Sequence, residues 1–214
     1  MESRVSIFLR SLFISLSATL IAFSLGFPTG VILGLYEGRL KTILSAIING
    51  LMGIPTVVRG LILYLLFSRY GPLGFLGLLY TPIAIIIGES LLVFPIVASL
   101  TMSVVERHRE YRELIEMLGL KGSEAYSLFL RELRIPLIAT FFTSFSRAIT
   151  ELGIALIVGG NLEGYTRTIT TAIALYVSMG LIDDAIKLGL SLLALIFTLS
   201  AIAKLLEARY YADS

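Results

Sequence analysis

The chain has 214 residues, of which 57% are hydrophobic, and its mean hydropathy of +0.92 lies far above that of a soluble domain. A formal net charge of +2 is too small to indicate a nucleic-acid-binding protein. The lack of cysteine excludes disulfides, thiol catalysis and thiolate metal sites. These values predict an all-α integral membrane protein, folded as a single domain over residues 1–214.

Apolar runs predict five transmembrane helices. Residues 11–36 carry no charge, so this run exceeds the about 20 residues that span a bilayer and the about 7–15 apolar residues of a signal peptide. We therefore expect a first span and no cleaved leader. The predicted spans are Leu12–Leu35, Thr42–Phe67, Leu73–Val105, Ile135–Val158 and Ala185–Ala203.

The uncharged stretch Thr168–Ile182 lies between the fourth and fifth predicted spans. As a helix it would be only about 22 Å long, which is shorter than a hydrocarbon core about 30 Å thick. We therefore expect a half-helix at one face of the membrane, packed against other parts of the protein.

A charged segment at about residues 106–135 separates the third and fourth predicted spans. If this segment is cytoplasmic, twice as many Lys and Arg residues lie inside as outside, in agreement with the positive-inside rule. This orientation predicts an external N-terminus and a cytoplasmic C-terminus. The single histidine, His108, begins this charged region, and we expect it to be a solvated surface residue.

Two short helices are predicted within the charged segment. Glu110–Met117 forms the first, with Leu114, Ile115 and Leu118 on its apolar side, and Gly119 ends it. Ser123 is expected to cap the second helix, whose apolar side includes Tyr126. On these residues alone, the segment could also be a well-capped surface loop between two spans.

The run from Glu113 to Gly119 matches the spacing of the "EAA" loop of ATP-binding-cassette (ABC) importer permeases, although Leu114 and Ile115 replace the two small residues of that pattern. Much of the chain resembles the tungstate-type branch of the molybdate/tungstate permeases, which have the MetI-like transmembrane fold. The segments that carry the resemblance are Leu51–Gly74, Tyr80–Val97 and Ser144–Tyr176. The most specific of these is the last, with Arg147, Glu151 and Gly153 followed by Gly159-Gly-Asn161 and Gly164-Tyr-Thr-Arg167-Thr.

The resemblance implies a non-catalytic permease subunit, without a cofactor, that imports tungstate or molybdate through the cell membrane. It implies a homodimer with the pore between the copies, an external substrate-binding protein, and a coupling helix that docks on a separate cytoplasmic ATPase. The chain has no G-x-x-x-x-G-K-[ST] loop with which to bind ATP itself. The residues assigned to the ATPase-coupling loop are Glu113, Leu114, Ile115, Leu118, Gly119, Ser123 and Tyr126.

Four ionisable residues fall within the predicted spans: Arg59, Glu89, Arg147 and Glu151. Each is costly in hydrocarbon and should find a partner or a watery cavity. Arg147 and Glu151 are four residues apart, which favours an ion pair on one helix. The four could form a neutral structural network, or they could line the path of an anion. Arg59 stands where the resembling family suggests an apolar residue, and it could pair with Glu89 or add a cationic contact.

Asn161, Tyr165 and Arg167 follow the fourth predicted span on the outer side, where they could contact a binding protein or form an ordinary polar loop. Alternatives to the tungstate or molybdate importer are an ABC permease for sulfate or phosphate and a secondary transporter driven by an ion gradient. Five spans without an inverted repeat argue against a secondary transporter.

Overall fold

The computed structural model describes residues 2–117 and 122–213, and these residues form helices without any strand. The expected all-α class is therefore confirmed. In chain order the elements are α1 (Arg4–Leu35), α2 (Arg39–Met52), α3 (Thr56–Phe67), the 3₁₀ turn η1 (Gly74–Leu76), α4 (Pro82–Arg107), α5 (Arg109–Met117), α6 (Gly122–Glu132), α7 (Arg134–Ile149), α8 (Gly153–Gly159), α9 (Ile169–Ser178) and α10 (Ile182–Asp213).

Three helices, α1, α4 and residues Ile182–Leu206 of α10, are long and apolar enough to cross a membrane. Two further spans are bent: α2 and α3 meet at 93°, and α7 and α8 meet at 55°. Counted as one span each, the bent pairs bring the total in the described residues to the predicted five.

Three of the predicted spans are not continuous helices with the expected limits. The second is broken at Gly53–Pro55, because proline lacks the N–H that would continue the helix. The fourth is broken at Thr150–Leu152. The third begins at Pro82 and not at Leu73, because the Thr81 hydroxyl caps the helix by accepting the N–H of Ala84.

A stripe of glycines brings α1 and α4 into backbone contact. A methyl group added at Gly30 would lie 2.5 Å from the carbonyl oxygen of Ala98, and one added at Gly34 would lie 2.7 Å from the Cβ of Val105. Gly26 is similarly close to α4. Small residues at this spacing let membrane helices approach closely, so α1 and α4 form the centre of the bundle.

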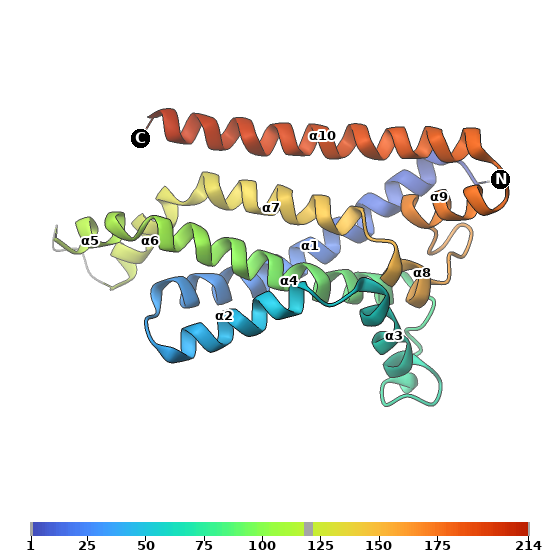
Figure 1. Cartoon of the computed structure of the whole chain (residues 1–214), viewed down its shortest axis with the longest axis horizontal. Helices are drawn as coiled ribbons and strands as arrows, with labels where there is room; N and C mark the ends of the chain where they lie inside the picture. The colour runs from blue at the N-terminus through green and yellow to red at the C-terminus, as the bar shows by residue number, and fades with distance from the viewer. Residues whose placement is uncertain (1, 118–121, 214) are drawn as a thin grey trace.

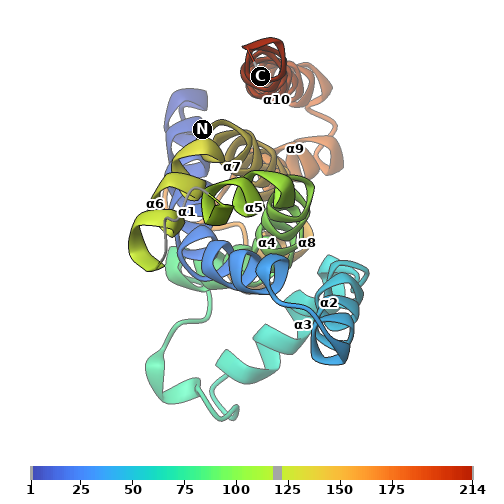
Figure 2. The ribbon, with the colours of Figure 1, turned by 90° about the vertical axis from the view of Figure 1, so that its left-hand side faces the viewer.

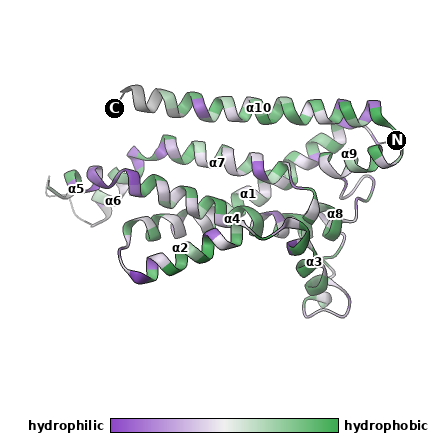
Figure 3. Ribbon diagram, in the orientation of Figure 1, coloured by the Kyte–Doolittle hydropathy of each residue, from purple (hydrophilic) through white to green (hydrophobic). Residues whose placement is uncertain are grey.

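The helices α1, α4 and α7 form a central group, with α10 on one flank and the α2–α3 pair on the opposite flank (Figures 1 and 2). The short helices α5 and α6 lie at one end of the bundle, and α8, α9 and the start of the chain lie at the other (Figure 1). Apolar residues cover most of the long helices, whereas hydrophilic residues gather at the α5–α6 end (Figure 3).

The expected half-helix is α9, Ile169–Ser178, too short to cross a bilayer. Its first turn is closed by a capping box: Thr168 accepts the N–H of Thr171, and the Thr171 hydroxyl accepts the N–H of Thr168. Its buried residues Ile169, Ala172 and Tyr176 pack in one core cluster with α1, α7 and α10.

Candidate functional site

The break between α7 and α8 carries an ion pair. Arg147 Nη1 lies 3.2 Å from Glu151 Oε2, as the spacing of four residues predicted. The other carboxylate oxygen of Glu151 accepts the N–H of Ile154 at 3.1 Å, so one buried side chain both neutralises Arg147 and satisfies the backbone after the break. The side chain of Arg147 remains 39% exposed in the single chain.

Glu89 is almost completely enclosed, with 1% of its surface exposed. It hydrogen-bonds the Ser15 side chain of α1, and it lies within electrostatic range of Arg147 and Glu151. Its Oε2 has no hydrogen-bond partner among the residues that the structure describes. Helices α1, α4 and α7 thus meet around a carboxyl group that forms no direct ion pair with the residues that the structure describes.

Arg59 lies at the start of α3, next to the α2–α3 break. Its Nη2 donates to the carbonyl oxygen of Leu51 near the end of α2, so the considered pairing with Glu89 is wrong. The bend brings the guanidinium to the last turn of α2, and a cation near a helix C-terminus is favourable. Arg59 is still close enough to Arg147 and Glu151 to interact electrostatically, and its buried Nη1 has no hydrogen-bond partner in the described part of the chain. All four predicted charges therefore gather in one region.

At the opposite end from α8 and α9, α5 and α6 form an apolar groove of about 420 Å³. Ile115 points into the core with Phe129 and Leu133, whereas the neighbouring Leu114 and Met117 are exposed at the groove. The predicted common apolar side of Leu114 and Ile115 is thus divided between the core and the surface. The groove is lined by Tyr111, Leu114, Ile115, Met117, Leu128 and Glu132.

Only some of the residues predicted for the coupling loop lie in the part of the chain that the structure describes. Glu113 is exposed on α5. Leu118 and Gly119 lie outside the described residues, as do the side chains of Ser123 and Tyr126. Helix α6 begins at Gly122, one residue before the position expected for its cap.

His108 is not the solvated residue that we expected. It lies between α4 and α5, is buried, and places Nδ1 2.8 Å from the carbonyl oxygen of Val104. The charged residues around it in the sequence suggested a surface, but the ring is enclosed where α4 joins α5.

The three residues predicted to contact a binding protein have two different roles in the α8–α9 loop. Arg167 is buried, and its Nε donates to Asn161 Oδ1 at 3.3 Å, while Asn161 Nδ2 donates to the carbonyl oxygen of Thr171. These two side chains hold the loop together. Tyr165 is 50% exposed and is free to contact a partner.

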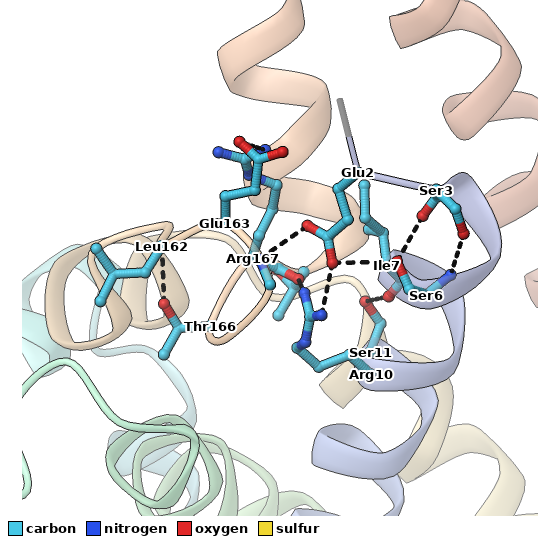
Figure 4. Close-up of polar contacts among 12 residues, drawn as sticks. Glu2, Ser3, Ser6, Ile7, Arg10, Ser11, Leu162, Glu163, Thr166 and Arg167 are labelled. Carbon is cyan, nitrogen blue, oxygen red and sulfur yellow. Dashed lines mark hydrogen bonds and ion pairs between the residues drawn. The ribbon is translucent and has the colours of Figure 1, made fainter.

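Glu2 and Arg10 form a polar cluster at the same end, which no pattern in the sequence predicted (Figure 4). Arg10 Nη2 donates to Glu2 Oε1 at 2.5 Å, and the other Glu2 oxygen accepts the N–H of Gly164 at 3.1 Å. Burial by itself would raise the pKa of Glu2, but the hydrogen bonds from Arg10 and Gly164 outweigh it and hold the pKa below its ordinary value.

The comparisons with known proteins agree with this architecture. The family described as the binding-protein-dependent transport system inner membrane component matches residues 26–211. The chain belongs to this family, and it is a multi-pass membrane permease.

Individual permeases share much of their sequence with this chain. The chain is 43% identical, over 92% of its length and 87% of the relative, to the tungstate uptake system permease protein TupB of Peptoclostridium acidaminophilum. It is 38% identical to TupB of Campylobacter jejuni, over 80% of this chain and 72% of the relative. A probable anion ABC transporter permease protein of Haloferax volcanii is 35% identical, over 92% and 88% of the two chains.

Proposed function

We propose that this chain is the permease of an ABC importer that carries tungstate into the cell. The observation that carries the proposal is the 43% identity to a tungstate permease over 92% of the chain. The relative that is named only as an anion permease supports the wider class. Molybdate, sulfate and phosphate are the competing oxyanions, because a permease contacts its substrate only briefly.

The proposed orientation places the α5–α6 end in the cytoplasm. The excess of Lys and Arg in this segment supports that placement. The groove beside Leu114 and Met117 offers apolar anchors with the exposed acidic Glu113 on the same helix, a combination suited to docking on the ATPase. When two ATPases close, α5 would transmit the movement to α4, and α6 would transmit it to α7, because each pair is adjacent in the chain.

The proposed assembly is a homodimer with the pore between its copies. The flanking α2–α3 pair exposes apolar side chains such as Ile43, Ile47 and Leu61, which can face either lipid or a second copy. Arg147 is partly exposed in the single chain, so it can face a pore between two subunits. A charge buried against lipid would be costly, which favours this arrangement.

Arg59 and Arg147 are the proposed cationic contacts for the anion in transit. A tetrahedral dianion needs charge-assisted hydrogen bonds on its way, but it must not be retained. Each guanidinium already has one partner: Arg59 donates to the carbonyl oxygen of Leu51, and Arg147 pairs with Glu151. These existing interactions would keep contacts with the anion weak. The Nη1 of Arg59 is buried and has no hydrogen-bond partner among the described residues, so it is the donor that we propose for a brief contact when the path opens.

Reconstitution tests the function directly. Proteoliposomes with the permease, its ATPase and its binding protein should accumulate tungstate only when ATP is supplied, measured by elemental mass spectrometry. Molybdate, sulfate and phosphate are assayed in parallel. ATP-driven accumulation of sulfate without tungstate would assign another oxyanion, and accumulation driven by an ion gradient without the ATPase would contradict the importer class.

The variants Arg59→Leu and Arg59→Lys test the path. If Arg59 contacts the anion, Arg59→Leu should lower uptake about tenfold, the loss of about one charge-assisted hydrogen bond, while the thermal midpoint stays close to that of the Lys variant. Arg59→Lys keeps the charge and should retain more uptake. Equal uptake in wild type and Arg59→Leu would remove Arg59 from the path.

A further inference from the structure

The segment before and at the start of α1 is fastened to the α8–α9 loop by Glu2. Its carboxylate receives three donors: Arg10 Nη2 at 2.5 Å, the Ser6 hydroxyl at 3.1 Å and the N–H of Gly164 at 3.1 Å (Figure 4). The Glu2 side chain is only 7% exposed. Three donors on one enclosed carboxylate form a strong local interaction, because each is a hydrogen bond to a charged group.

Arg10 extends this interaction into the loop. While Nη2 holds Glu2, Nη1 donates to the carbonyl oxygen of Arg167 at 3.0 Å. At the next residue of α1, the Ser11 hydroxyl accepts the N–H of Ile169, the first residue of α9, at 2.8 Å. The first turns of α1 therefore bind the loop at Gly164, Arg167 and Ile169, and we name the Glu2–Arg10 pair with these loop contacts the α1 clasp.

The loop needs this support because its backbone is irregular. Gly160, Asn161 and Gly164 all have left-handed φ angles, of 68°, 52° and 74°. Within the loop, the carbonyl oxygen of Leu162 accepts the N–H groups of Tyr165, Thr166 and Arg167, and the Thr166 hydroxyl accepts the N–H of Leu162. The contacts from Glu2 and Arg10 then fix this loop against the start of α1. In that shape Leu162 is 45% exposed and Tyr165 is 50% exposed.

We propose that the α1 clasp is a positioning device that holds residues 160–167 in the shape recognised by the external binding protein, with Leu162 and Tyr165 as its contacts. The inference rests on the proposed importer function, which requires such a partner at the end opposite α5–α6. Exposed tyrosines are enriched in protein interfaces and are frequent anchors there, and the exposed Leu162 adds apolar area next to Tyr165. Asn161 and Arg167 act inside the loop, and Glu2 and Arg10 act on it from α1.

The chain provides a matched control for this inference. Arg4 and Asp184 form an ion pair of 2.5 Å at the same end of the molecule, between α1 and the start of α10. This pair makes no contact with residues 160–167 in the interactions described above. Arg4→Ala therefore removes a charge pair near the clasp without releasing the loop, whereas Glu2→Ala releases it.

The experiment measures the affinity of tungstate-loaded binding protein for the complete transporter in nanodiscs, together with its basal ATP hydrolysis. Glu2→Ala and Tyr165→Ala should each weaken binding about tenfold, the effect of losing about 1.4 kcal/mol, whereas Arg4→Ala should stay within about twofold of wild type. Basal hydrolysis should be unchanged in Glu2→Ala and Arg4→Ala. Glu2→Gln, which keeps an oxygen acceptor for Gly164, should show an intermediate loss.

Hydrogen exchange at the Gly164 amide gives a second measure that does not depend on the partner. Glu2→Ala should accelerate this exchange, and Arg4→Ala should not. Wild-type affinity in Glu2→Ala together with accelerated exchange would overturn the inference, because the loop would then be released without any effect on docking. If wild-type transporter binds no loaded binding protein at all, the proposed function itself fails, and the inference fails with it.

Discussion

The contact between α1 and α4 allows a prediction with a magnitude. Gly30→Ala would place a methyl group 2.5 Å from the Ala98 carbonyl oxygen and 2.6 Å from the Cβ of Thr101, whereas carbon atoms pack at about 3.5–4.0 Å. The oxygen belongs to the main chain of α4, so a side chain cannot simply rotate away. Overpacking of this kind costs about 1–3 kcal/mol.

For a chain of this size, each kcal/mol corresponds to about 2–4 °C in Tm, so Gly30→Ala should lower the apparent Tm by about 2–12 °C. The assay is thermal unfolding in one detergent at one scan rate. Gly189→Ala is the control: it lies within α10, and nothing lies within 4 Å of the added methyl group. That variant should keep or raise the Tm, because alanine favours a helix over glycine. Equal Tm values for the two variants would refute the close approach of α1 and α4.

Three further predictions follow from the other sites. Glu151→Leu removes the partner of Arg147 and the acceptor of the Ile154 N–H, and it should destabilise the protein by about 2 kcal/mol, measured as a fall in Tm; an unchanged Tm would contradict the structural role of the pair. The pKa of Glu2 is lowered in the folded protein, so its contribution to stability is complete above the ordinary value of 4.5 and is lost as the pH falls through the folded value. Hydrogen exchange at the Gly164 amide, corrected for its intrinsic pH dependence, should therefore accelerate in that acidic range. A corrected exchange rate that does not change with pH would argue against the role of Glu2. Met117→Asp at the groove should abolish co-purification of the ATPase from mild detergent, and retention of the ATPase would place its docking surface elsewhere.

The sequence by itself determined the class of membrane protein, the number of spans, the half-helix α9 and the Arg147–Glu151 pair. These features depend on hydrophobicity along the chain or on residues one helical turn apart, and both are readable locally. The resemblance identified the permease family for the same reason, because the motifs that carry it are short and contiguous in the sequence.

Only the tertiary structure decided which long-range partners the polar groups take. The bend at Gly53–Pro55 makes the carbonyl oxygen of Leu51, and not Glu89, the hydrogen-bond partner of Arg59. Packing against α1 brings Gly164 to Glu2, 162 positions away in the chain. No local pattern encodes such a contact, because it exists only after α1, α7 and α9 have packed. The same packing turned Asn161 and Arg167 inward and left Tyr165 exposed, since their directions depend on the closed loop and not on residue type.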